Sequence, residues 1–236
     1  MKKYYVIMLP LMILSLVGCK KGVTYTEVDD ISMYYSEDNV AAAKLAAGQL
    51  NIGILSSTQT ADGMDYQIKR TIDLNYSYQY SKATQNGTTL IGKDLYLPNF
   101  EDADLAQAYE ILITDGEPTQ EFKSGNYVNE TYSGHVNTFR TLVTNYIDNP
   151  LHTAKLYIEG NPYNLMWYKG SDGTLKVTCT NEDKSIRAST IIYAKTLYVK
   201  KTTLIWDAHG SFSYSFSYPK SVKHKTPADI GYVIPL

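Results

Sequence analysis

Residues 66–80, YQIKRTIDLNYSYQY, carry the clearest secondary-structure signal in the chain. Aromatic and aliphatic side chains alternate with polar ones over about 15 residues, and this period of two predicts a long β-strand with one face in water. Arg70 interrupts the apolar face. A guanidinium buried there would need a carboxylate or a ligand head group as its partner. The segment predicts that β-structure dominates the fold.

Turn signals divide the rest of the chain into further strands. Asn86-Gly87 supplies the positive φ angles of a tight turn, so we expect residues 88–97 to return antiparallel. Residues 101–114 fit both a helix face and a strand, and we favour a short helical start before a strand at 108–114. The remaining strands are predicted at 119–132 (broken near 125–126), 153–160, 163–169, 174–180, 187–199, 202–207 and 211–218.

Two segments show helical periodicity. Ser36 is a suitable N-cap for an alanine-rich segment with acidic residues in its first turn, which predicts a helix over 37–50. Ser133 is expected to cap a second helix that ends at Asn149-Pro150. Its apolar residues recur at the spacing of one helix face, which suits packing on a sheet. They are Val136, Phe139, Leu142, Val143, Tyr146 and Ile147.

These elements predict an α+β fold that is mainly antiparallel β. We expect one large curled sheet, similar to an unclosed barrel, with one or two helices packed against its concave side. Residues 36–236 are long enough for a single β-rich domain with a substantial core. The chain has 22 tyrosines against 5 phenylalanines. Tyrosine carries a polar hydroxyl on an apolar ring and therefore suits half-wet surfaces such as the rims of grooves.

The N-terminus predicts where the protein is located. Two lysines precede an apolar segment, Tyr4–Val17, which is too short to span a bilayer because a spanning helix needs roughly 20 apolar residues. The segment leads into Leu16-Val17-Gly18-Cys19, which resembles the lipobox of bacterial lipoproteins. The resemblance implies that residues 1–18 are a cleaved signal peptide and that Cys19 carries diacylglycerol. Residues 19–35 would then be a lipidated tether, and the domain would lie outside the cytoplasm on a bacterial cell membrane or outer membrane.

Charge and motif content argue against several function classes. With 22 Lys and Arg against 24 Asp and Glu, nothing favours nucleic-acid binding. The four histidines are not at metal-ligand spacing and no cofactor motif is present, so we expect neither a metal nor a cofactor. The stretch 207–211, DAHGS, holds the residue types of a catalytic triad, but triad partners come from separate elements and we expect a hairpin turn. Cys179 alternates with polar neighbours and is expected in the core. The sequence does not predict an enzyme.

The aromatic faces of the predicted strands supply the candidate ligand-binding residues. If the interior of the sheet is hollow, these residues would line an apolar cavity of roughly several hundred Å³. If the interior is filled, they are ordinary core residues and Arg70 pairs with a carboxylate. The candidates are Tyr66, Arg70, Tyr76, Tyr78, Phe212, Tyr214 and Phe216.

The order of elements over roughly residues 37–227 is a helix, long strands with tight hairpins, an inserted amphipathic helix and a second run of hairpins. The chain then finishes with Ser217-Tyr218-Pro219-Lys220 and Lys225-Thr226-Pro227. This pattern resembles the unclosed-barrel carriers of the bacterial envelope, which include LolA-like lipoprotein carriers and the lipoproteins that carry glycolipids in mycobacterial envelopes. The resemblance implies a curved sheet that holds an apolar ligand under helical lids, and it transfers no site residue.

Two functions are left open by the sequence. One is a structural or protein-interaction lipoprotein of the envelope. The other is a carrier or sensor of a hydrophobic ligand, such as a lipid, held in the concave face of the sheet. In both cases the membrane is a partner through lipidated Cys19, and the second partner is an envelope protein or a hydrophobic small molecule.

Overall fold

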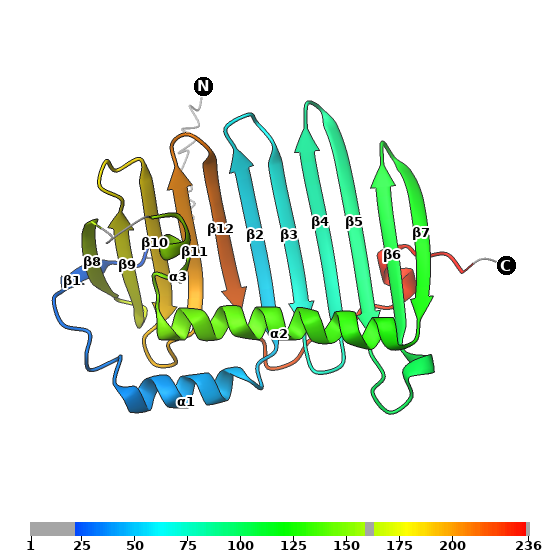
Figure 1. The fold of residues 1–236 in the computed structure, drawn as a ribbon, viewed down its shortest axis with the longest axis horizontal. Coiled ribbons are helices and arrows are strands. Elements are labelled where there is room, and N and C mark those ends of the chain that lie inside the picture. The colour runs from blue at the N-terminus through cyan, green and yellow to red at the C-terminus, as the bar shows by residue number, and fades with distance from the viewer. Residues whose placement is uncertain (1–21, 159–162, 235–236) are drawn as a thin grey trace, which may run out of the picture.

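The computed structural model describes residues 22–158 and 163–234. Within these ranges the chain is mainly antiparallel β-structure: a single 12-stranded sheet that does not close into a barrel, accompanied by four α-helices (Figure 1). This confirms the expected α+β fold with one large curled sheet. The lipobox and Cys19 lie outside the described residues, as do the last two residues of the strand predicted at 153–160.

The strands follow the chain as two meanders separated by two helices. In the sheet the order is β1-β8-β9-β10-β11-β12-β2-β3-β4-β5-β6-β7. The strands are β1 (Tyr25–Val28), β2 (Ile52–Thr60), β3 (Asp65–Ile72), β4 (Ser77–Gln85), β5 (Thr88–Leu97), β6 (Gln107–Thr114), β7 (Glu117–Ser124), β8 (Tyr163–Gly170), β9 (Thr174–Thr180), β10 (Ile186–Tyr193), β11 (Val199–Trp206) and β12 (Gly210–Ser217). The helices are α1 (Glu37–Ala47), α2 (Asn126–Asp148), α3 (His152–Tyr157) and α4 (Pro227–Ile230), with one 3-10 turn, η1 (Ala103–Leu105).

The two meanders meet at the centre of the sheet. The last strand, β12, pairs antiparallel with β2, so that Phe216 lies opposite Ile54 although the two residues are far apart in sequence. At one edge, β1 pairs with β8, with Val28 opposite Trp167. Residues 25–28, which we expected in the tether, are therefore part of the sheet.

The helix α2 crosses the strands of the sheet along one face (Figure 1). Its N-terminal half buries Val128, Tyr132 and Val136 against Ile72, Tyr96 and Ala108, and its C-terminal half buries Val143, Tyr146 and Ile147 against strands of the second meander and α1. Each such buried side chain contributes about 1.5–3 kcal/mol by leaving water. The face that carries α2 and α3 is called the inner face below.

The opposite face, called the outer face, is partly covered by the C-terminal segment. Ile230 of α4 is buried there against Leu95 and Ile111. Because neighbours in a strand point to opposite faces, Leu95 lies on the outer face while Tyr96, which contacts α2, lies on the inner face. Alternation of this kind assigns a face to every strand residue discussed below.

The continuous strand predicted at 66–80 is wrong. The segment forms β3 and β4, which pair with each other, with Arg70 opposite Gln79. Asp73 makes the turn between them: its carboxylate accepts a hydrogen bond from the Asn75 N–H at 2.8 Å, the pattern of an Asx turn. The alternation of aromatic residues conceals this turn because Asp73 and Asn75 occupy polar positions of the pattern.

Several predicted boundaries also differ from the structure. The strand predicted over 119–132 ends as β7 at Ser124; Gly125 then adopts a φ of 93° and α2 begins, so Ser133 lies inside this helix instead of capping it. The segment predicted as a strand at 153–160 instead contains α3, because Leu151, Ala154 and Ile158 pack together on the sheet at helical spacing.

The predicted strand at 187–199 is likewise two strands, since β10 ends at Tyr193 and β11 begins at Val199. Besides β1, two further elements were not predicted, β2 and α4. The strands β8 and β9 and the helix α1 lie close to their predicted positions, and Ser36 caps α1 by accepting the Asn39 N–H at 3.3 Å.

Candidate functional site

The turn between β3 and β4 decides which of the candidate residues share a face. On β3 the inner face carries the even-numbered residues, including Tyr66 and Arg70; on β4 it carries the odd-numbered ones, such as Gln79. Tyr78 therefore lies on the outer face, where Lys225 Nζ is 5.2 Å from its ring centroid. Tyr76 is buried in the turn and stacks on His224 with ring centroids 4.3 Å apart. The prediction that Tyr76 and Tyr78 belong to the ligand-binding face is therefore wrong, because neither lies on the inner face with the other candidates.

The three candidates on β12 are on the inner face with Tyr66 and Arg70. Phe212, Tyr214 and Phe216 are opposite inner-face residues of β2, and successive ring centroids lie 5.6 and 6.2 Å apart. The rings continue to α2 and α3, where Tyr146 contacts Phe216 at 5.9 Å and Tyr157 contacts Phe212 at 5.6 Å. We call these five side chains the aromatic ladder.

Small side chains lie on the inner face beside the aromatic ladder. Ser56 on β2, Ser81 on β4 and Gly92 on β5 fall in one row with Ile68 of β3. At Gly92 a Cβ atom would lie 2.6 Å from Ser81 Oγ, so this position accepts no larger side chain without movement of Ser81. Apart from Ile68, the side chains of this row therefore extend only a short distance from the sheet.

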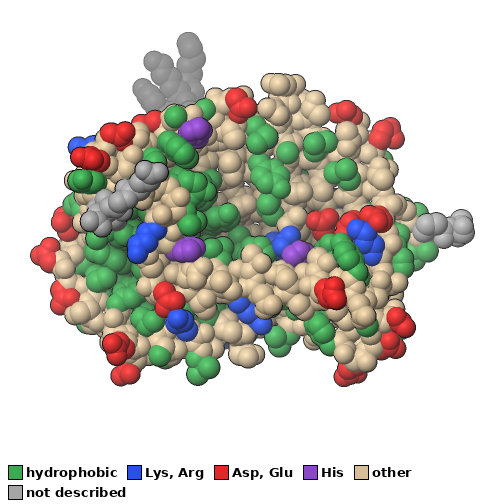
Figure 2. Space-filling model, viewed as in Figure 1, with side chains coloured by type: hydrophobic (Ala, Val, Ile, Leu, Met, Phe, Trp, Pro, Cys, Tyr) green, Lys and Arg blue, Asp and Glu red, His purple; other side chains and the backbone are tan. Residues whose placement is uncertain are grey.

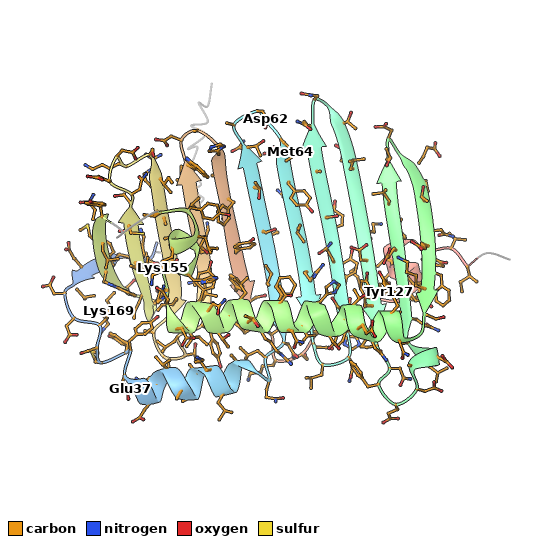
Figure 3. All side chains as sticks on the ribbon, viewed as in Figure 1. Glu37, Asp62, Met64, Tyr127, Lys155 and Lys169 are labelled. Atoms are coloured by element: carbon orange, nitrogen blue, oxygen red, sulfur yellow. The ribbon has the colours of Figure 1, made fainter. Side chains whose placement is uncertain are left out.

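Figure 2 shows the inner face hollowed above α2. A hollow of about 410 Å³ opens over β4–β7 and is lined by Ser81, Gly92, Asp94, Glu110, Leu112 and Glu121, among others. Figure 3 shows Asp62 and Met64 at the β2–β3 turn, on the rim of the sheet away from α2, and Lys155 on α3. We call the hollowed part of the inner face, from the aromatic ladder to β7, the inner groove.

A row of charged and polar residues crosses the inner groove in register. Arg70 of β3 is opposite Gln79 of β4, which is opposite Asp94 of β5, followed by Glu110 of β6 and Glu121 of β7. We call these five residues the polar row. It begins where the aromatic side ends, because Arg70 is opposite Ile54, which is itself opposite Phe216. The inner groove is thus apolar on one side and charged on the other.

Hydrogen bonds connect the polar row in two groups. In the first, Arg70 Nη2 donates to Gln79 Oε1, and Gln79 Nε2 donates to Asp94 Oδ2 at 3.0 Å. In the second, Lys123 Nζ is 2.9 Å from Glu110 Oε2 and 3.2 Å from Glu121 Oε2. Tyr96 also donates its hydroxyl to Glu110 Oε1 at 2.8 Å. Gln79 therefore separates the guanidinium from the nearest carboxylate.

Burial shifts the ionisation of this region. It raises the pKa of Asp94, with Glu110 adding repulsion, and it lowers the pKa of Arg70. His135 of α2 lies edge-on to Tyr96 at 5.1 Å, and burial together with the Arg70 charge lowers its pKa to about 4, so it is neutral at pH 7. Among the described residues, neither Arg70 Nε nor His135 Nδ1 has a hydrogen-bond partner, although both atoms are buried. The centre of the inner face thus has unused donor and acceptor capacity.

The sequence analysis missed most of the polar row. Arg70 stands out in the sequence because it interrupts an apolar face. Gln79, Asp94, Glu110 and Glu121 each look like an ordinary solvated position of a strand. Their alignment depends on the registers of four strand pairs, which local periodicity does not determine. No signal within any one strand could have located the row.

Asp207, His209 and Cys179 take structural positions outside the groove. Asp207 pairs with Arg187 at 2.6 Å, and His209 packs on Trp206. Residues 207–209 form the turn of the expected hairpin, and β12 begins at Gly210. Cys179 is buried and its pKa is raised to about 11. In residues 22–158 and 163–234 no group of three His, Cys, Asp or Glu side chains is arranged to hold a metal ion.

No helix of the described chain combines the length and the apolar character needed to cross a membrane.

Comparison with known proteins finds no family model that matches the chain and no curated protein that matches its sequence. The chemistry of the inner groove is therefore the basis for a functional conclusion. An apolar side next to a charged side can accept a molecule that is itself amphiphilic.

Proposed function

We propose that this chain is a lipid-anchored protein of the bacterial envelope that carries or senses an amphiphilic ligand in its inner groove. The observation that carries the proposal is the hollow over β4–β7, which the polar row lines in part, with the aromatic ladder on the same face beyond β2 and β3. Phe212, Tyr214 and Tyr157 are the ladder residues with exposed surface for hydrocarbon, because Phe216 and Tyr146 are buried in the core. The polar row supplies hydrogen-bonding groups for a head.

The composition of the inner face supports ligand binding over a purely structural role. A face that only holds the fold together is filled to high density by large side chains. Here Ser56, Ser81 and Gly92 occupy the row directly above the polar row, and Leu112 beside them is 53% exposed. Small residues beside an exposed apolar side chain leave room for an apolar part of a ligand.

The anchor is the second part of the proposal. Diacylglycerol on Cys19 would hold the domain at a membrane surface, where lipids are available as ligands, because each buried CH₂ contributes about 0.8 kcal/mol. Replacing Cys19 with Ser should leave the precursor unprocessed and change its partitioning between membrane and aqueous fractions. Identical processing and partitioning of both forms would contradict the anchor.

A pair of adjacent serines tests the groove. Ser56 lies on the inner face of β2 and Ser57 on its outer face. The full chain, purified in a mild detergent, is incubated with a water-soluble short-chain phospholipid, and native mass spectrometry counts the bound lipid. Ser56→Trp fills the groove and should reduce bound lipid about tenfold, equivalent to about 1.4 kcal/mol.

Ser57→Trp is the matched control and should bind lipid like the unchanged protein. Lipid extraction of the purified chain should in addition release a co-purified amphiphile that the Ser56→Trp variant lacks. If neither protein binds lipid, or if both variants bind it equally, the proposed function is wrong.

A further inference from the structure

The polar row separates opposite charges in a way that is unusual for a structural network. Arg70 forms no ion pair with any described residue, and its contact with Asp94 is indirect, through the two ends of the Gln79 amide. Ion pairs that serve stability bring the charges into direct contact, because a buried charge without a partner is costly. The row thus leaves a cation and an anion each short of a counter-charge.

The two under-compensated groups differ in their surroundings. Arg70 lies beneath α2, with its guanidinium carbon 5.0 Å from the Phe139 ring centroid and its Nε buried without a hydrogen-bond partner. Asp94 lies at the hollow of about 410 Å³, together with Glu110 and Glu121. Lys123 contacts both of the last two, whereas no cation among the described residues contacts Asp94.

The spacing of the two groups sets the size of a matching ligand. Arg70 and Asp94 are on inner-face positions of β3 and β5. The strand between them, β4, carries Gln79. Neighbouring strands lie about 4.8 Å apart, so the two Cα atoms are roughly 10 Å apart. The Gln79 amide bridges that gap, and one compact group with two opposite charges could take its place between the two side chains.

Resting on the proposed function, we infer that the inner groove selects zwitterionic amphiphiles whose head group pairs a phosphate with a primary amine. The phosphate takes the place of the Gln79 oxygen as acceptor from Arg70, and the ammonium lies in the hollow against Asp94. The hydrocarbon extends from there over the aromatic ladder. Such a head supplies both missing counter-charges and leaves the net charge of the site unchanged.

The need to pair both Arg70 and Asp94 disfavours the simpler head groups. Arg70 and Lys123 carry two positive charges, against three on Asp94, Glu110 and Glu121. A head with only a phosphate would add negative charge beside a carboxylate that already lacks a partner. A head with only an amine would offset the excess negative charge and pair with Asp94, but it would leave Arg70 without an anionic partner.

The test is a competition between two head groups on identical tails. The full chain in a mild nonionic detergent is incubated with equimolar dihexanoylphosphatidylethanolamine and dihexanoylphosphatidylglycerol, and native mass spectrometry gives the ratio of the two bound lipids. Both lipids contain the phosphate, but only the first contains the amine. We expect the first to exceed the second about tenfold.

Two variants separate the contributions of the charges. Asp94→Asn, which has nearly the same shape, should bring the ratio to about 1 while total bound lipid falls little. Arg70→Gln should lower the binding of both lipids about tenfold, because both present a phosphate. Asp65→Asn and Lys69→Gln change the same charge types at exposed, outer-face positions of β3 and should have no effect.

The outcomes test the head-group inference and the proposed function separately. Equal binding of the two lipids by the unchanged chain, or a ratio that Asp94→Asn does not alter, overturns the head-group inference alone. Asp94→Asn keeps this test valid if Arg70→Gln fails to fold. Free phosphoethanolamine should not displace the bound lipid; if it does so at equal concentration, the ligand is a soluble phosphoamine. If the unchanged chain binds no lipid, the proposed function fails and this inference with it.

Discussion

At the scale of single residues, the face on which a side chain lies matters more than its chemical type. Tyr66 and Tyr78 belong to the same aromatic pattern in the sequence, but they lie on opposite faces of the sheet. We expect Tyr66→Ala to reduce lipid binding several-fold without a large loss of stability. Tyr78→Ala should leave lipid binding unchanged and lower the free energy of unfolding by about 1–2 kcal/mol, since it removes contacts under the C-terminal segment.

Native mass spectrometry and urea unfolding of the two variants measure these effects. Loss of lipid binding in Tyr78→Ala alone would mean that the functional face has been assigned to the wrong side of the sheet.

His135 gives the protein a predictable response to acid. Its pKa is near 6.5 in the unfolded chain and about 4 in the folded protein, where burial and Arg70 disfavour the imidazolium. Between these two pKa values the unfolded chain binds more protons, so lowering the pH through this window lowers the free energy of unfolding. We expect about 1–2 kcal/mol less stability at pH 4.5 than at pH 6.5 from this group.

The measurement is urea unfolding at both pH values for the unchanged protein and for His135→Gln. Asp94, whose pKa is raised, acts in the opposite direction in both proteins. The difference between the proteins therefore isolates His135, and equal pH dependence in both would contradict its buried neutral state.

Cys179 should be chemically inert while the protein is folded. Burial raises the pKa of its thiol from 9.0 to about 11, which reduces the reactive thiolate about 100-fold even before steric shielding. Alkylation by iodoacetamide, followed by mass spectrometry of the peptide that contains Cys179, should proceed at least about 100 times more slowly in buffer than in urea. Rapid labelling in buffer would place this thiol at the surface.

The sequence predicted groove residues correctly only where the alternation of apolar and polar residues belongs to a single strand. Tyr66, Phe212, Tyr214 and Phe216 were found because each belongs to an alternating strand, and all four share the inner face. Tyr76 was wrong because the Asp73 turn shifts the alternation by one position. One residue inserted in a turn is enough to move a whole strand of side chains to the other face.

At the scale of elements, two serines distinguish the predicted helix boundaries from the observed ones. Ser36 accepts the Asn39 N–H and caps α1, whereas Ser133 lies within α2. Ser36→Ala should lower the free energy of unfolding by about 1 kcal/mol. Ser133→Ala should be neutral or slightly stabilising, because alanine is the better residue in a helix interior. A loss of about 1 kcal/mol or more in urea unfolding of Ser133→Ala would argue that the helix starts where the sequence pattern placed it.

The errors at the level of elements have a common physical cause. The start of α2 and the whole of α3 are stabilised by contacts with the sheet, since Val128 and Ala154 are both almost fully buried there. Their sequences have no strong helical propensity, and tertiary packing decides their conformation. By contrast, α1 carries its own cap and acidic first turn, and its position was predicted correctly.

At the scale of the whole molecule, the fold class follows from patterns that every part of the chain repeats. Alternating strands with tight turns predict an antiparallel sheet even when individual boundaries are wrong. The polar row is a property of the assembled sheet, because it exists only when five strands take the registers observed. The sequence therefore predicts the architecture well and the charged half of the groove hardly at all.

The pairing of β12 with β2 has a consequence for how the molecule is made. These central neighbours are among the last and the first strands to be synthesised, so β2 has an unpaired edge until residue 217 has emerged. Contacts between such distant segments form slowly, and exposed strand edges invite aggregation in the meantime. The growing chain should therefore stay prone to aggregation, and its demand for a chaperone should end only with the arrival of its closing strand.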